Sequence, residues 1–267
     1  MNKKHTIRAI KKLKFNKEPF CCITAYDSSV AKIIDSLDIP IILVGDSASM
    51  VMMGNDSTIP ITIEEMLVFV KSVSKNTKNA LVVADMPFMS YQASKEVAIK
   101  NAGTFIKAGG ANAVKIEGGA SISNKIKALV NCGIPVMGHI GLLPQSINQQ
   151  SGYNLQGKNK LDADNLVNDA LSVQNAGAFS IVLEGMPSRL SKKITQSLDI
   201  PTIGIGAGPH CNGQIQVFHD IVGLFDTFVP KHSKQYINLS NHIKKSLNNY
   251  INDVKNKTFP SKEHYQN

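Results

Sequence analysis

Hydrophobic and polar positions divide the chain into a repeated pair of segments. In each pair, a short apolar run typical of a buried strand is followed by a longer amphipathic segment typical of a helix. The strand-like runs lie at 20–27, 41–46, 80–87, 113–119, 135–141, 179–185 and 201–208, with a possible eighth at 215–224. The helix-like segments lie at 28–38, 62–75, 94–110, 121–133, 163–177 and 188–199. Strands that alternate with helices predict a parallel sheet with helical crossovers.

Seven or eight such units in 267 residues favour a (β/α)8 TIM barrel over an open doubly wound sheet. We found no linker or low-complexity segment, so we expect a single domain over residues 1–267. The basic segment 1–15 predicts a surface helix or arm. Residues 232–267 predict a final helix and a polar tail.

The cysteines, the first residues and the lengths of the apolar runs bear on the compartment in which the protein is found. The four cysteines form no C-x-x-C motif, which favours buried thiols in a reducing compartment, and we expect a cytoplasmic protein. The acid-free start weakly resembles a transit peptide but is poor in Arg and Ser. No apolar run reaches the roughly 20 residues of a membrane span, so we expect no membrane partner.

The net charge of +9 raises the alternative of a basic barrel that binds RNA or a protein partner. The charge comes almost wholly from lysines, and Arg8 and Arg189 are the only arginines. No basic patch is interleaved with aromatic residues. We therefore expect no nucleic-acid partner and interpret the charge as a solvated surface.

Polar and charged residues stand at the ends of successive predicted strands. Because the carboxyl ends of barrel strands converge on one face, these side chains are expected to meet there. They are Asp27, Asp46, Asp85, Lys115 with Glu117, His139 and Glu184.

Lys115 and Glu117 lie two residues apart on one strand, so their side chains point to the same face. Asp46, Asp85 and Glu117 together would repel one another unless a cation neutralised them. Oxygen ligands suit Mg²⁺, and Lys115 would then meet an anionic substrate beside the metal.

Each residue also has a structural interpretation. Asp27, followed by two serines and an apolar helix, is best explained as a helix cap. Asp85 could be an ordinary loop aspartate, and Lys115 and Glu117 could form a structural ion pair inside the barrel. His139 could be a histidine of the core. Glu184, which precedes a glycine, has little structural reason to be there. The glycines at 204–208 favour a close approach of backbone more than a nucleotide loop.

Several motifs resemble one enzyme family closely. They are LVGDS (43–47), DSTIPIT (56–62), ADMPFMSY (84–91), VKIEGG (114–119), GHIGLLPQS (138–146), GY-x-x-QG (152–157), LEGMP (183–187), GIGAG (204–208) and GQIQVFHD (213–220). In this order and spacing the chain resembles the ketopantoate hydroxymethyltransferases.

The resemblance implies a (β/α)8 barrel that forms a homo-oligomer, typically a decamer. It implies a Mg²⁺-dependent aldol-type transfer in pantothenate and coenzyme A biosynthesis. The substrates would be 3-methyl-2-oxobutanoate and 5,10-methylenetetrahydrofolate, and the products 2-dehydropantoate and tetrahydrofolate.

The family's residue roles transfer to matching positions of this chain. The metal positions fall on Asp46, Asp85 and Glu117, and the first two also match substrate positions. Ser47 and Lys115 match substrate contacts, and Glu184 matches the catalytic base. His139 is a possible auxiliary group that shuttles a proton or orients the substrate.

Two departures and two further alternatives remain. Leu143 stands where the family usually has Thr, and Asn212 where it usually has Asp. Neither falls on a metal or base position, so they bear on folate-side or packing contacts. An inactive relative is one alternative. A lyase or mutase of the phosphoenolpyruvate mutase and isocitrate lyase type is the other, although no suitable cysteine-bearing loop follows the fourth predicted strand.

Overall fold

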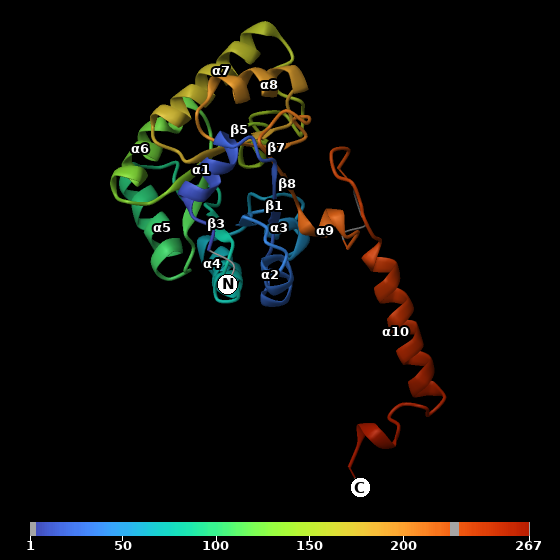
Figure 1. Ribbon diagram of the computed structural model, residues 1–267. Helices are drawn as coiled ribbons and strands as arrows, with labels where there is room; N and C mark the ends of the chain where they lie inside the picture. The colour runs from blue at the N-terminus through green and yellow to red at the C-terminus, as the bar shows by residue number, and fades with distance from the viewer. Residues whose placement is uncertain (1–3, 225–229, 267) are drawn as a thin grey trace. The chain divides into compact units, whose positions relative to one another are not determined.

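A computed structural model describes residues 4–224 and 230–266 of the chain. Its strands pair in chain order, all parallel, and the eighth pairs with the first to close a barrel (Figure 1). The predicted (β/α)8 barrel is therefore confirmed. The strands are β1 (Phe20–Thr24), β2 (Ile41–Val44), β3 (Leu81–Asp85), β4 (Ala113–Glu117), β5 (Val136–Gly141), β6 (Ser180–Glu184), β7 (Thr202–Ile205) and β8 (Gly213–Gln216).

Within residues 1–217, helices alternate with the strands and lie around the sheet (Figure 1). The six predicted helix-like segments all contain helices. The helices are α1 (Ile7–Phe15), α2 (Ser28–Asp35), α3 (Ala48–Val51), α4 (Ile63–Ser74), α5 (Lys95–Lys107), α6 (Ser123–Asn131), α7 (Lys160–Asn175), α8 (Ser188–Ser197), α9 (Phe218–Ile221) and α10 (Leu239–Lys255). Short 3-10 turns are η1 (Ala120–Ile122), η2 (Pro144–Ser146) and η3 (Lys262–His264).

Local capping fixes where two of these helices begin. The Asp27 carboxylate accepts hydrogen bonds from the backbone N–H groups of Ser29 and Val30, so its predicted role as the cap of α2 is confirmed. Thr62 and Glu65 bond reciprocally at the start of α4 and form a capping box. Asp27 is thereby occupied at a helix terminus, whereas the other strand-end carboxylates remain available to a site.

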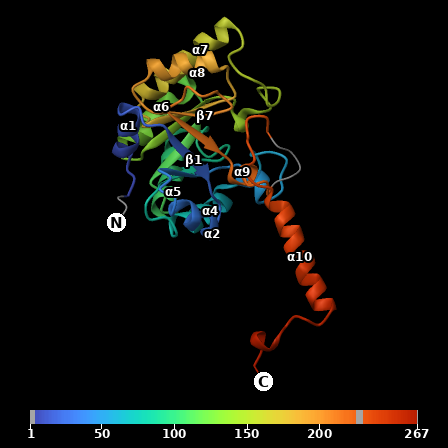
Figure 2. The same ribbon diagram turned by 45° about the vertical axis from the view of Figure 1, so that its right-hand side comes forward.

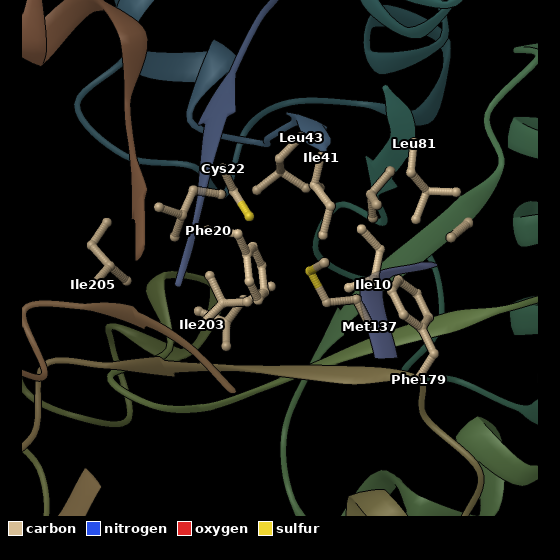
Figure 3. Close-up of a cluster of buried hydrophobic side chains, with 14 residues drawn as sticks. Ile10, Phe20, Cys22, Ile41, Leu43, Leu81, Met137, Phe179, Ile203 and Ile205 are labelled. Atoms are coloured by element: carbon tan, nitrogen blue, oxygen red, sulfur yellow. The ribbon is translucent and has the colours of Figure 1, made fainter. Parts of the chain in front are cut away.

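The barrel interior near the amino ends of the strands is a hydrophobic cluster closed by α1. Ile10 of α1 is fully buried among Phe20, Met137 and Phe179 in this cluster (Figure 3). The Lys14 ammonium donates to the backbone carbonyls of Thr195 and Ile200, which precede β7. The basic amino-terminal segment is thus a helix that seals one end of the barrel and leaves the opposite end for chemistry.

The eighth strand differs from the prediction. Only the first residues of the expected run at 215–224 belong to the strand. β8 spans Gly213–Gln216, and residues 218–221 are helical. Barrel closure sets this register: Gly213 lies opposite both Phe20 of β1 and Ile203 of β7. A Cβ at Gly213 would lie 2.6 Å from the Phe20 ring, so a glycine is required there. Apolar periodicity along one segment carries no information about this contact.

The chain divides into two compact units, residues 1–217 and 218–267. The first contains the whole barrel. The second contains the predicted final helix as α10, visible in Figure 2. Within the described chain no residue of α10 is buried, and its apolar side chains are exposed at Ile243, Leu247, Tyr250, Ile251 and Val254. A single domain over residues 1–267 stays a prediction. No helix among the described residues is long and apolar enough to span a membrane.

Candidate active site

The ends of β3 and β4 hold a buried ion pair. Register places Asp85 beside Lys115 on the neighbouring strand. The Lys115 Nζ lies 2.7 Å and 2.8 Å from the two carboxylate oxygens of Asp85. Both side chains are almost fully buried. A charged pair removed from water in this way is costly unless each partner is well satisfied, and it is typical of functional sites.

Lys115 also faces Glu117 on its own strand, as the strand alternation predicted. The Lys115 Nζ lies 3.5 Å from Glu117 Oε1, farther than from Asp85. Burial lowers the pKa of Lys115, but the charges of Asp85, Glu117 and Asp46 more than reverse this and raise it. Lys115 is therefore held as a cation among three carboxylates.

Asp46 adds a further carboxylate at the end of β2. Its backbone N–H donates to Asp85 Oδ2 at 3.3 Å, which brings the two strand ends together. Burial, and then the charges of Asp85 and Glu117, raise the pKa of Asp46 well above its ordinary value. Burial also raises the pKa of Asp85, although Lys115 opposes this effect. Burial therefore disfavours the ionised forms of Asp46 and Asp85 unless a cation lies beside them.

His139, within β5, lies between two carboxylates. Its Nδ1 is 3.4 Å from Glu117 Oε1, and its Nε2 is 3.3 Å from Glu184 Oε2. Burial and Lys115 lower the pKa of His139, but Glu117 and Glu184 outweigh them and raise it to about 9. His139 therefore links the carboxylate cluster to Glu184, the least buried member of the group.

Ser47 lies on the rim beside this cluster. Its hydroxyl is 2.8 Å from the hydroxyl of Tyr26, which is buried at the end of the segment after β1. Ser47 precedes α3 but makes no side-chain cap to that helix. Its hydroxyl therefore does not cap the helix, and it can form a hydrogen bond with a bound ligand.

Two uncharged residues complete the cluster. Tyr91 and Gln145 are buried and hydrogen-bonded to each other at 2.8 Å. The Gln145 amide donates to Asp46 Oδ2, and the Tyr91 hydroxyl accepts from the backbone N–H of Glu117. Sequence reasoning missed both, because an uncharged residue in a loop gives no electrostatic signal. Both lie inside the quoted motifs ADMPFMSY and GHIGLLPQS.

The donor set suits a hard divalent cation. Asp46, Asp85 and Glu117 provide buried carboxylate oxygens, the donor type that Mg²⁺ prefers. Among the described residues, Glu117 Oε1 is a buried oxygen with no hydrogen-bond donor. The described side chains as they stand hold no group of three His, Cys, Asp or Glu arranged around one ion position. The chemistry of the oxygens therefore fits Mg²⁺, while their present geometry is shaped by Lys115.

The glycine-rich strand β7 and the two departures have structural roles. A Cβ at Gly208 would lie 2.5 Å from the Ser188 hydroxyl, which confirms the predicted close approach. Asn212 Oδ1 accepts from the backbone N–H and the hydroxyl of Thr202 and so ties the chain before β8 to β7. Leu143 lines a pocket of about 220 Å³ beside the end of β5, apart from the carboxylate cluster.

Comparison with known proteins identifies the family. A model of the family described as ketopantoate hydroxymethyltransferase matches residues 4–262. The chain belongs to the ketopantoate hydroxymethyltransferase family. It is 51% identical over 256 residues to the 3-methyl-2-oxobutanoate hydroxymethyltransferase of Dehalococcoides mccartyi (strain CBDB1), covering 96% of this chain and 92% of that one. It is 49% identical over 261 residues to the enzyme of that name from Clostridium beijerinckii, covering 98% and 95%.

The resemblance found in the motifs is thus confirmed, as is the enzyme class, 3-methyl-2-oxobutanoate hydroxymethyltransferase. Solved structures add the fold. A phosphoenolpyruvate phosphomutase from Streptomyces platensis subsp. rosaceus superposes with a TM-score of 0.64 at 14% identity, covering 98% of this chain and 92% of that chain. A phosphonopyruvate hydrolase complex with oxalate and Mg²⁺ gives 0.62 at 12% identity, covering 97% and 93%. At such identities the likeness shows the barrel fold alone for this ketopantoate hydroxymethyltransferase family member.

Proposed function

We propose that this enzyme transfers a hydroxymethyl group from 5,10-methylenetetrahydrofolate to 3-methyl-2-oxobutanoate. Water supplies the hydroxyl oxygen, and the products are 2-dehydropantoate and tetrahydrofolate. This step would serve pantothenate and coenzyme A biosynthesis. The observation that carries the proposal is Lys115, a buried cation held among Asp85, Glu117 and Asp46 and linked through His139 to Glu184.

Mg²⁺ is the proposed cofactor. Asp46, Asp85 and Glu117 would hold it, and both oxygens of Asp85 also accept from Lys115. When bound, Mg²⁺ would supply Lewis-acid polarisation of a 2-oxo acid. Burial, and then the charges of Asp85 and Glu117, raise the pKa of Asp46, and a divalent cation would offset both effects, which supports this assignment.

Substrate recognition falls to Ser47 and Lys115, with Asp46 and Asp85 beside them. An anionic 2-oxo acid is attracted to a buried ammonium group, and Lys115 can hold its carboxylate or the oxygen on which negative charge develops. The Ser47 hydroxyl can donate a hydrogen bond to the same ligand, since its partner Tyr26 can act as either donor or acceptor.

Glu184 is the proposed base. It would remove the proton from C3 of 3-methyl-2-oxobutanoate, and Lys115 would stabilise the enolate oxygen. The enolate carbon then forms a bond to the one-carbon unit, both bonds of that unit to the folate nitrogens break, and water supplies its hydroxyl group. The C3 proton and the remaining proton of the water balance the two folate nitrogens, which leaves tetrahydrofolate. His139, 3.3 Å from Glu184 Oε2, would orient that carboxylate or relay its proton.

The proposal extends to the assembly and the location of the protein. A homo-oligomer, a decamer by resemblance, would cover the exposed apolar side chains of α10. Cytoplasmic location follows from the thiols and from a biosynthetic role. Small-molecule 2-oxo acid and folate are the expected partners, and neither a nucleic acid nor a membrane is expected.

Proton NMR in D₂O tests the proposal directly. Purified protein is incubated with 3-methyl-2-oxobutanoate, with and without Mg²⁺, and with and without 5,10-methylenetetrahydrofolate. We expect Mg²⁺-dependent loss of the C3 proton signal without folate and the appearance of 2-dehydropantoate when folate is added. Exchange without product would contradict the folate donor but retain the enolate site. Folded protein that shows neither exchange nor product would overturn the assignment and favour the lyase alternative.

A further inference from the structure

One buried side chain, that of Gln145, joins several strand ends of the barrel mouth. Its Nε2 donates to Asp46 Oδ2 and to the backbone carbonyl of Met86, both at 2.9 Å. Its backbone N–H donates to Glu117 Oε2 at 3.1 Å. Its Oε1 accepts from the Tyr91 hydroxyl at 2.8 Å. Gln145 therefore contacts two of the three carboxylates assigned to the cation and follows β5 in the chain, although those carboxylates belong to β2 and β4.

The orientation of the Gln145 amide follows from its surroundings. Asp46 Oδ2 and the Met86 carbonyl can only accept, so the nitrogen must face them. Gln92 Nε2 and the Tyr91 hydroxyl donate to the oxygen on the other side. A flipped amide would place an oxygen against two acceptors, which is unfavourable in a buried site. The network therefore has one stable arrangement.

Tyr91 extends this network to the backbone of β4. Its hydroxyl accepts from the Glu117 N–H at 3.0 Å and also lies 3.2 Å from the Glu117 carbonyl oxygen. Tyr91 is 1% exposed. Tyr91 thus fixes both Gln145 and the strand residue that carries the Glu117 carboxylate.

We propose that Gln145 and Tyr91 are positioning residues that hold the Asp46 and Glu117 carboxylates in the orientation required for cation binding and enolate formation. This role rests on the proposed function. Gln145 bonds Asp46 Oδ2 and Glu117 Oε2, so the network does not use the other oxygen of each carboxylate, Asp46 Oδ1 and Glu117 Oε1. Glu117 Oε1 instead faces the charged groups of the site, 3.5 Å from Lys115 Nζ and 3.4 Å from His139 Nδ1. Without the network, both carboxylates would rotate or move apart to relieve their mutual repulsion.

Three variants test the pair. Tyr91→Phe removes only the hydroxyl, Gln145→Leu removes the amide, and Gln145→Glu keeps the side-chain size but cannot donate when ionised. Outer-shell partners of metal ligands typically change affinity or activity by 10–100-fold. We expect each variant to weaken Mg²⁺ binding, measured by calorimetry, and to slow the folate-independent C3 exchange by about 10–100-fold. The double variant Tyr91→Phe with Gln145→Leu should lose little more than the worse single variant, because the residues act as a unit.

Gln174→Leu is the matched control. Gln174 Oε1 accepts from the backbone N–H groups of Asp199 and Ile200, near the amino end of β7, and contacts no candidate site residue. We expect it to lower the melting temperature while exchange and Mg²⁺ affinity stay within twofold of the parent, as roughly expected for a site outside the network. A similar loss of exchange in Gln174→Leu would assign the effect to stability.

The outcomes separate this inference from the proposed function. A parent protein that exchanges, with folded Tyr91→Phe unchanged in both exchange and Mg²⁺ affinity, overturns the positioning role alone. A parent that binds Mg²⁺ without exchange contradicts the proposed function, while calorimetry of the variants still decides the positioning role. A parent that neither binds Mg²⁺ nor exchanges overturns both.

Discussion

Lys115 on β4 bonds both carboxylate oxygens of Asp85 on β3, at 2.7 Å and 2.8 Å. The pair joins neighbouring strands at the mouth of the barrel and lies closer than the contact between Lys115 and Glu117 on one strand. The cation that the sequence shows beside a glutamate is therefore held mainly by an aspartate thirty residues earlier in the chain. Removing either partner leaves a buried charge without its closest counterion.

Lys115→Met should destabilise the protein by about 3–5 kcal/mol, because it leaves Asp85 charged and buried without a partner. Urea unfolding in EDTA measures this change. Added Mg²⁺ should restore part of the stability by neutralising the same carboxylates. Lys193→Met is the control, since its 3.4 Å pair with Asp164 is exposed and should contribute at most about 1 kcal/mol. An equal loss in both variants would contradict the importance of the buried pair.

Glu184→Gln should abolish C3 proton exchange while retaining Mg²⁺ and 2-oxo acid binding. Glutamine cannot accept the proton, and loss of a general base typically slows a reaction by about 10²–10⁴-fold. Exchange followed by NMR and binding followed by calorimetry provide the two measurements. The exposed Glu64→Gln serves as the control and should exchange normally. Normal turnover by Glu184→Gln would remove Glu184 as the base.

Asp46→Asn should raise stability in EDTA and weaken Mg²⁺ binding. Burial and the nearby carboxylates raise the pKa of Asp46, so its ionised form disfavours the folded state at neutral pH. An amide of the same shape removes that cost but also removes a proposed ligand. Melting curves with and without Mg²⁺ should show a higher starting value and a smaller Mg²⁺-induced rise than in the parent.

Asp164→Asn is the control for Asp46→Asn. Because Asp164 is exposed, this variant should change neither the melting temperature nor its Mg²⁺-induced rise measurably. Asp85→Asn should likewise weaken the Mg²⁺ requirement, but it also removes the partner of Lys115 and is expected to lower stability. An unchanged Mg²⁺ requirement in both active-site variants would argue against the proposed metal ligands.

Ile10→Ala should reduce stability without affecting the chemistry. Ile10 is fully buried in the cluster that closes the amino end of the barrel, and such a truncation costs about 2–5 kcal/mol. Exchange by the folded fraction should match the parent, because the site lies at the carboxyl ends of the strands. Ile33→Ala, at an exposed position of α2, should stay within about 0.5 kcal/mol. A loss of exchange in Ile10→Ala at full folding would contradict this separation.

The sequence alone determined the barrel, the strand ends that carry charge and the family. Period-two alternation placed Lys115 and Glu117 on one face, and a helix cap could be assigned to Asp27, because both are local properties of a few adjacent residues. The motifs spread over the chain were enough to identify the family. None of this required knowledge of which strand lies beside which.

The tertiary structure decided which residues of the site contact one another. Strand register pairs Lys115 with Asp85 and sets the start of β8 at Gly213, and neither follows from local periodicity. Tyr91 and Gln145 carry no charge, and Tyr91 lies in a loop and Gln145 in the short turn η2, so only folding shows that they contact Asp46 and Glu117. Hydrogen bonds between residues as far apart as Asp46 and Gln145 form only when barrel closure brings the strand ends together, because sequence patterns record local periodicity and not distance in space.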